Sequence, residues 1–95
     1  MDNEEHIKFC LFHAAEASRS KVLKIETQKF VPQGVTGFAL LAESHLSIHT
    51  WPEKGVAKCD IFTCSDKAKP EKAVEYLGEA LEAEQIDSDT FNRLL

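Results

Sequence analysis

The chain has 95 residues, of which 43% are hydrophobic and 28% are charged, and its formal net charge is −5. A chain of this length forms one domain with a modest core. The negative charge and the absence of a lysine and arginine cluster argue against a nucleic-acid surface, because such surfaces neutralise phosphates. No apolar run approaches the roughly 18 residues of a membrane span, and the acidic start is not that of a signal peptide. Three cysteines without disulfide-scaffold spacing predict reduced thiols in the cytoplasm.

The N-terminal third predicts a helix followed by a strand. Asp2 and Glu5 have the spacing of a capping box, and apolar side chains then recur at helical intervals. This pattern predicts a helix over residues 3–18. Apolar and polar side chains alternate over residues 21–31, with Leu23 in the apolar series, which predicts a strand with one wet face.

The rest of the chain predicts two further strands and a second helix. After a turn at "PQG", an apolar run continues over residues 37–50 and predicts one buried strand. Residues 56–64 predict another strand, and residues 70–84 a helix with Pro70 in its first turn. The tail after this helix is ambiguous.

The predicted order α-β-β-β-α has strands joined by short turns. It indicates an α+β fold, a two-layer sandwich in which an antiparallel sheet carries two helices on one face. We expect residues 1–95 to form this single domain, and the other face of the sheet to need cover.

The stretch "AESHLSIHTWPE" holds an unusual amount of polar chemistry. In a strand, alternation places His45, Ser47 and His49 on one face and Leu46 and Ile48 on the other. The polar face is either plain solvent-facing surface or a site.

Two kinds of site can be weighed from the residues alone. A zinc site could use His45, His49, Cys59 and Cys64, but four strand residues span about 13 Å, whereas donors around one zinc lie about 3–4 Å apart. A hydrolase could use Cys64 as nucleophile and His49 as base. The commoner fate of a free cysteine is burial as a small apolar side chain, and this interpretation applies to both thiols.

The segment "GVTGFALLAESHLSIHTWPEKG", followed by "DIFTC", resembles the prokaryotic S-adenosylmethionine decarboxylases, the short pyruvoyl-dependent proenzymes. The match runs from about Lys29 to Cys64 and continues more loosely through "KPEKAVEYLGEAL" and back through residues 3–28. Relatives usually begin with a strand of the type "GRHL" before the first helix, and this sequence has no counterpart of it.

The resemblance implies that the chain cuts itself between Glu43 and Ser44. The Ser44 hydroxyl attacks the preceding carbonyl to give an ester, and elimination and hydrolysis then leave a pyruvoyl group as cofactor. Residues 1–43 and 44–95 remain associated as two chains.

The resemblance also implies roles for the other site residues. His49 occupies the position of the processing base, and Thr36 that of an assisting hydroxyl where many relatives have serine. The pyruvoyl carbonyl forms a Schiff base with S-adenosylmethionine and accepts electrons as carbon dioxide leaves. Cys64 is then the proton donor, Phe30 and His49 enclose the adenine, and Glu53 binds the ribose hydroxyls.

The implied protein is a homodimer that needs no metal and makes the aminopropyl donor for spermidine synthesis. Cys59 and Trp51 are then packing residues. Two other functions stay open: pyruvoyl-dependent decarboxylation of arginine or ornithine, and a non-catalytic homologue that never matures. Phe30 and Glu53 favour a nucleoside substrate, since a guanidinium or a short diamine needs neither.

Overall fold

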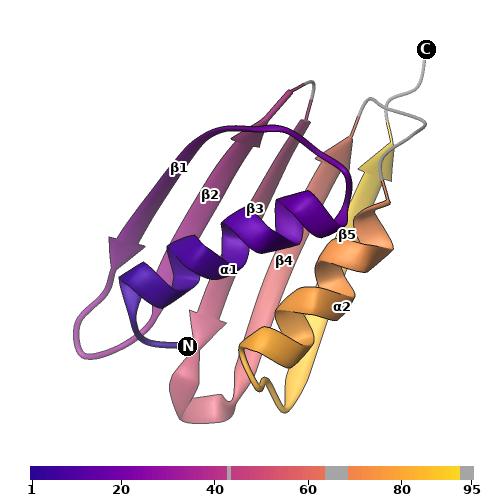
Figure 1. Ribbon diagram of the computed structural model, residues 1–95. Helices are drawn as coiled ribbons and strands as arrows, with labels where there is room; N and C mark the ends of the chain where they lie inside the picture. The colour runs from indigo at the N-terminus through magenta and orange to yellow at the C-terminus, as the bar shows by residue number, and fades with distance from the viewer. Residues whose placement is uncertain (43, 64–68, 93–95) are drawn as a thin grey trace.

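The computed structural model describes residues 1–42, 44–63 and 69–92. Within these residues, two helices and a five-stranded sheet follow one another along the chain (Figure 1). The elements are α1 (Glu4–Ala17), β1 (Val22–Lys29), β2 (Val35–Leu41), β3 (Ser44–Trp51), a 3-10 turn (Pro52–Lys54), β4 (Val56–Thr63), α2 (Pro70–Ala80) and β5 (Gln85–Asn92).

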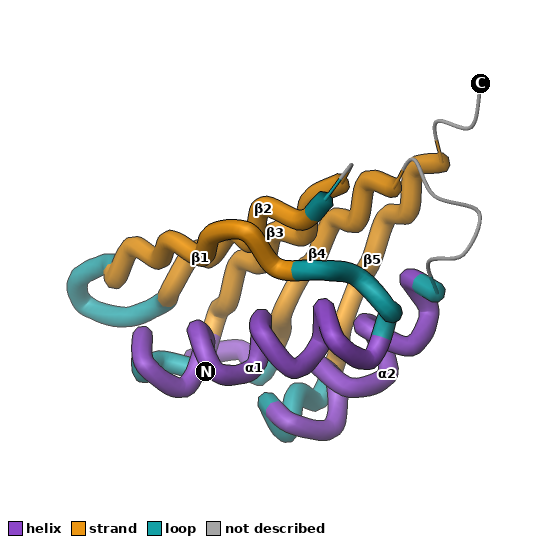
Figure 2. Tube along the Cα trace, turned by 45° about the horizontal axis from the view of Figure 1, so that its top comes forward, coloured by secondary structure: helices purple, strands orange, loops and turns teal. Residues whose placement is uncertain are grey.

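The sheet has the strand order β1-β2-β3-β4-β5, and successive strands from β1 to β4 are antiparallel. β5 lies parallel to β4, because the chain crosses over through α2 before it returns to the sheet. Figure 2 shows both helices on the same side of the sheet. The predicted α+β class, a two-layer sandwich with both helices on one face, is confirmed.

The stretch predicted as one strand over residues 37–50 is two strands, so that prediction is wrong. β2 and β3 form a hairpin in which Leu41 and Ser44 are ladder partners. The chain reverses direction between these two residues, and the intervening sequence, Ala42 and Glu43, contains none of the Gly, Pro, Asn or Asp residues that mark tight turns. Glu43 itself lies outside the described residues.

Three smaller predictions are corrected, and the tail that the sequence left ambiguous is assigned. A register shift near the start of β1 turns Leu23 outward, and its side chain is 57% exposed. The N-cap of α1 is Asn3, whose side chain accepts a hydrogen bond from the His6 amide, and not Asp2. The ambiguous tail forms β5, and α2 ends at Ala80 before the predicted end of the helix.

The core lies between the helices and the sheet. Leu46 and Ile48 of β3 are buried there with Leu11 of α1 and Leu77 of α2. Gly37 lets α1 approach β2 closely, since a Cβ atom on it would lie 2.7 Å from Leu11 Cδ1. The helices thus cover one side of β3 and leave its alternate side chains facing away from them.

Candidate active site

The uncovered face of β3 carries polar side chains at alternate positions. Leu46 and Ile48 are buried under the helices, whereas His45, Ser47 and His49 are only partly buried. Because side chains alternate along a strand, these three lie on the opposite face. The division predicted from the sequence is confirmed.

Thr36 and His49 form the central pair of this face. They are ladder partners in the β2–β3 hairpin, and Thr36 Oγ1 lies 3.0 Å from His49 Nδ1. In the tautomer in which Nδ1–H donates to Oγ1, the Nε2 atom keeps a free lone pair. The imidazole is then held by the hydroxyl and can accept a proton from a third group.

Phe30 and Glu53 lie at the same end of the sheet as His49. Lys29 at the end of β1 pairs with Val35 at the start of β2, which in turn is next to the partner of His49. Phe30 directly follows β1 and is 50% exposed, and Glu53 is exposed in the 3-10 turn after β3. An aromatic ring, an imidazole and a carboxylate are therefore available to a ligand at this end.

Three aromatic contacts on this face were not predicted. Trp51 is 41% exposed and its ring centroid lies 6.3 Å from that of His49, so the prediction of a packing role is wrong. The shared parity of positions 49 and 51 could have placed both on one face. The ring of His45 stacks against those of Phe38 and Phe62, at centroid distances of 5.8 and 5.3 Å.

Ser44 lies at the other end of β3. It is the first residue of the strand and pairs with Thr63 of β4. His49 is five residues further along, which is about 16 Å in a strand, and alternation points the two side chains to opposite faces. Glu43 and Cys64, the predicted cleavage partner and proton donor, lie outside the described residues. Within a single chain, the predicted cleavage residue Ser44 and its predicted base His49 are therefore far apart.

A family model described as S-adenosylmethionine decarboxylase matches residues 1–94 of this chain. The chain belongs to the S-adenosylmethionine decarboxylase family. It is 47% identical over 93 residues to an S-adenosylmethionine decarboxylase proenzyme of Prochlorococcus marinus (strain MIT 9211), covering 98% of this chain and 76% of that relative. A proenzyme of the same name from Clostridium tetani (strain Massachusetts / E88) is 41% identical over 93 residues, covering 98% of this chain and 74% of the relative.

A solved structure of the S-adenosylmethionine decarboxylase family shares the fold. The crystal structure of the adenosylmethionine decarboxylase from Aquifex aeolicus VF5 matches with a TM-score of 0.70 and 34% identity, over 88% of this chain and 69% of that chain. The resemblance that the central motif predicted is thereby confirmed at the level of family and fold.

Cys59 lies on the helix-covered face of the sheet in this S-adenosylmethionine decarboxylase family member. It is fully buried and pairs with the core residue Ile48, as expected of a packing residue. The sheet separates its thiol from His45 and His49, so these three cannot meet around one zinc ion. Among the described residues, no three His, Cys, Asp or Glu side chains are grouped to hold a metal ion.

The Cys59 thiol is expected to resist alkylation in the folded protein. Burial, and to a smaller extent the neighbouring charges of Asp60 and Asp89, raise the pKa of Cys59 to about 11. At pH 8 about one molecule in a thousand then carries the reactive thiolate. Iodoacetamide followed by peptide mass spectrometry should find Cys59 unmodified before denaturation and modified after it. Rapid labelling of Cys59 in the folded protein would contradict the packing role.

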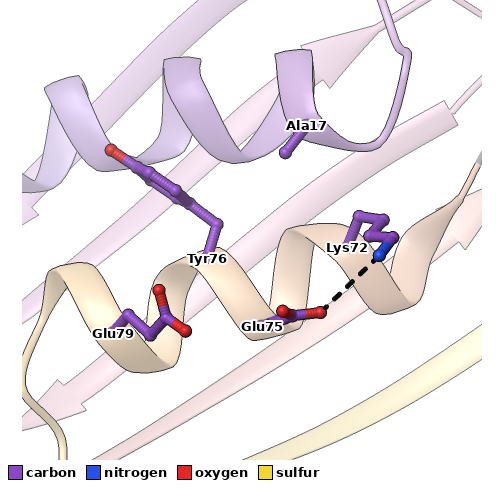
Figure 3. A pocket seen from close by; sticks show the side chains of 5 residues that line it. All are labelled: Ala17, Lys72, Glu75, Tyr76 and Glu79. Carbon is purple, nitrogen blue, oxygen red and sulfur yellow. Dashed lines mark ion pairs between the residues drawn. The ribbon is translucent and has the colours of Figure 1, made fainter.

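A pocket between α1 and α2 lies apart from the candidate site. It is lined by Ala17, Lys72, Glu75, Tyr76 and Glu79 (Figure 3). Lys72 and Glu75 form an exposed ion pair of 3.9 Å, and burial raises the pKa of Tyr76. The pocket opens on the helix layer, on the far side of the sheet from Thr36 and His49.

Neither helix in the described residues is long and apolar enough to cross a membrane.

Proposed function

We propose that this chain is a self-cleaving, pyruvoyl-dependent decarboxylase of S-adenosylmethionine. The observation that carries the proposal is the pairing of Thr36 with His49 at 3.0 Å. The two residues expected to assist processing lie 13 positions apart in the sequence and meet on one face of the sheet. Relatives named S-adenosylmethionine decarboxylase proenzyme, at 39% to 49% identity, support both the substrate and the self-processing.

Self-cleavage uses the Ser44 hydroxyl. Its oxygen attacks the carbonyl carbon of Glu43, and the peptide C–N bond is exchanged for an ester as the nitrogen takes up a proton. A base removes the Cα proton of Ser44, and the main-chain carboxylate of Glu43 leaves from the Cβ atom of Ser44. Hydrolysis then releases ammonia and leaves a pyruvoyl group.

The position of Ser44 in the fold is suited to forming a pyruvoyl group by chain cleavage. Because β2 ends at Leu41 and β3 begins at Ser44, the cut falls between two strands and leaves their ladder intact. The chains 1–43 and 44–95 then stay associated through the sheet. A hydroxyl in the middle of either strand would not offer this.

The other residues bind substrate and move protons. The pyruvoyl group supplies a carbonyl that accepts electrons as carbon dioxide leaves. The exposed ring of Phe30 and the imidazole of His49 offer faces to the adenine, and the Glu53 carboxylate accepts hydrogen bonds from the ribose. Cys64 donates the proton that replaces the carboxylate. Phe30 and Glu53 favour S-adenosylmethionine over arginine or ornithine, and the product would be an aminopropyl donor for spermidine synthesis.

We further propose a homodimer in which each site is completed by the second copy. The uncovered face exposes Phe38 and Leu40, at 39% and 40%, which favours burial against another surface. Within one chain, Ser44 and His49 are about 16 Å apart along β3. In a two-fold contact, residue i meets j and j meets i, so a second copy can bring its His49 to the Ser44 end of β3. Ser44 is the first residue of the strand, and its side chain must turn toward the uncovered face for His49 of the other copy to reach it.

We place the enzyme in the cytoplasm. In the described part of the chain, Cys10 and Cys59 are both free, buried thiols. Reduced thiols are typical of the cytoplasmic redox environment.

Denaturing mass spectrometry of freshly purified protein is expected to show two chains, 1–43 and 44–95, the second beginning with pyruvoyl. Carbon dioxide release from S-adenosylmethionine should exceed that from arginine or ornithine by several orders of magnitude, because the bound nucleoside positions the amine. Borohydride with substrate should tag the 44–95 chain alone. An uncut, untagged chain would remove the cofactor. Equal activity on arginine would overturn the substrate and leave the cofactor standing.

A further inference from the structure

The N-terminal segment is hydrogen-bonded to the loop that joins β1 to β2. One carboxylate oxygen of Asp2, Oδ1, accepts a hydrogen bond from the Gly34 amide at 2.6 Å and another from Lys29 Nζ at 2.8 Å. Lys29 and Gly34 flank residues 30–33 on either side. One side chain therefore holds both ends of this loop.

The N-terminal segment is also hydrogen-bonded to β3, the strand that carries His49. The Thr50 hydroxyl donates to the main-chain oxygen of Met1 at 2.9 Å and accepts from the Val35 amide at 2.9 Å. Thr50 is buried and directly follows His49. The segment at Met1 and Asp2 thus fixes the loop relative to the end of β3.

The loop presents apolar side chains to solvent. Phe30 is 50% and Val31 is 95% exposed, although the loop is closed by a hydrogen bond of 2.8 Å from the Phe30 amide to the Gly34 oxygen. Gly34 has a φ of 108°, a conformation that glycine adopts readily and other residues rarely do. This defined loop conformation is suited to offering Phe30 to a planar ligand.

We propose that Asp2 is a positioning residue for the adenosyl group, acting through the loop that carries Phe30. The inference rests on the proposed function, because it takes S-adenosylmethionine as the ligand of Phe30. The hydrogen bond from Lys29, and next the one from the Gly34 amide, lower the pKa of Asp2. The carboxylate is therefore ionised at neutral pH, where both of its hydrogen bonds are charge-assisted.

Steady-state kinetics of the processed protein, per pyruvoyl-bearing chain, test the role of Asp2. Asp2→Ala should raise KM for S-adenosylmethionine roughly tenfold with kcat within about twofold, because it loosens binding and leaves the reacting groups in place. Lys29→Met removes one of the two hydrogen bonds and should have a smaller effect. Glu4→Ala, which removes the bond from Thr27 between α1 and β1, is the matched control and should leave KM unchanged.

A double variant separates a positioning role from general loosening. In a Phe30→Ala background, Asp2→Ala should add little to KM, because the ring that it positions is already gone. Amide hydrogen exchange without substrate should show faster exchange at Gly34 in Asp2→Ala than in wild type. An unchanged KM in an active Asp2→Ala protein, or full additivity with Phe30→Ala, would overturn the inference and leave the proposed function intact. An inactive wild type would overturn the proposed function itself, even where the exchange result shows that Asp2 is hydrogen-bonded to Gly34.

Discussion

Ser44→Ala is expected to remain a single chain of 95 residues and to release no carbon dioxide from S-adenosylmethionine. Alanine offers no oxygen to attack the Glu43 carbonyl and no leaving group for the elimination. The fold should persist, because Ser44 is only half-buried at the first position of β3. Denaturing mass spectrometry shows the uncut chain, and thermal melting shows that it is folded.

Two variants make this result specific. Ser47→Ala removes another hydroxyl of β3 and should still give two chains. Cys64→Ala should also cleave itself but lose most decarboxylation, because it removes the proposed proton donor and leaves the processing serine in place. Cleavage of Ser44→Ala at the same bond would show that another group attacks, and would remove Ser44 as the source of the cofactor.

The faces of β3 could be predicted because alternation is a local property of a strand. Leu46 and Ile48 are apolar and the core takes them, so His45 and His49 follow onto the other face without any knowledge of the neighbouring strands. The boundary before Ser44 was missed for the opposite reason. Its turn depends on pairing between β2 and β3, and its residues carry no local turn signal.

The contacts of the candidate site depend on register, which the sequence alone leaves open. Thr36 meets His49 because the hairpin pairs positions 36 and 49. A slip of one residue would turn one of these side chains toward the helices. The resemblance to the family supplied both residues, and only the structure supplied their distance. Asp2 has the spacing of a helix cap, and its bond to Gly34 depends on a loop 32 residues away.

β5 was left open for a similar reason. Its sequence, "QIDSDTFN", is polar at most positions, because it lies at one edge of the sheet. Its parallel pairing with β4 depends on the crossover through α2. A polar edge strand of this kind has little hydrophobic pattern from which to predict it.

His49→Ala is expected to slow self-cleavage by roughly 10²–10⁴-fold, the usual contribution of a positioned base. Processing should stop at or before the ester, since the Cα proton of Ser44 then has no acceptor. Hydroxylamine should cut any ester that accumulates, and mass spectrometry would detect the cut. Thr36→Val should slow processing less, because it removes the hydroxyl that orients the imidazole and leaves the base. Thr36→Ser should process normally.

Co-expression of Ser44→Ala with His49→Ala then decides whether the base acts across the dimer. In a mixed dimer, the Ser44→Ala chain contributes an intact His49 to the Ser44 of the other copy. The His49→Ala chain alone should be cut, and random pairing should restore about one quarter of the wild-type sites. As control, a chain carrying both substitutions should restore no cutting when it is paired with His49→Ala. If affinity tags show mixed dimers and neither chain is cut, the base acts within its own chain. The 16 Å separation along β3 would then have to be closed by a rearrangement of the strand.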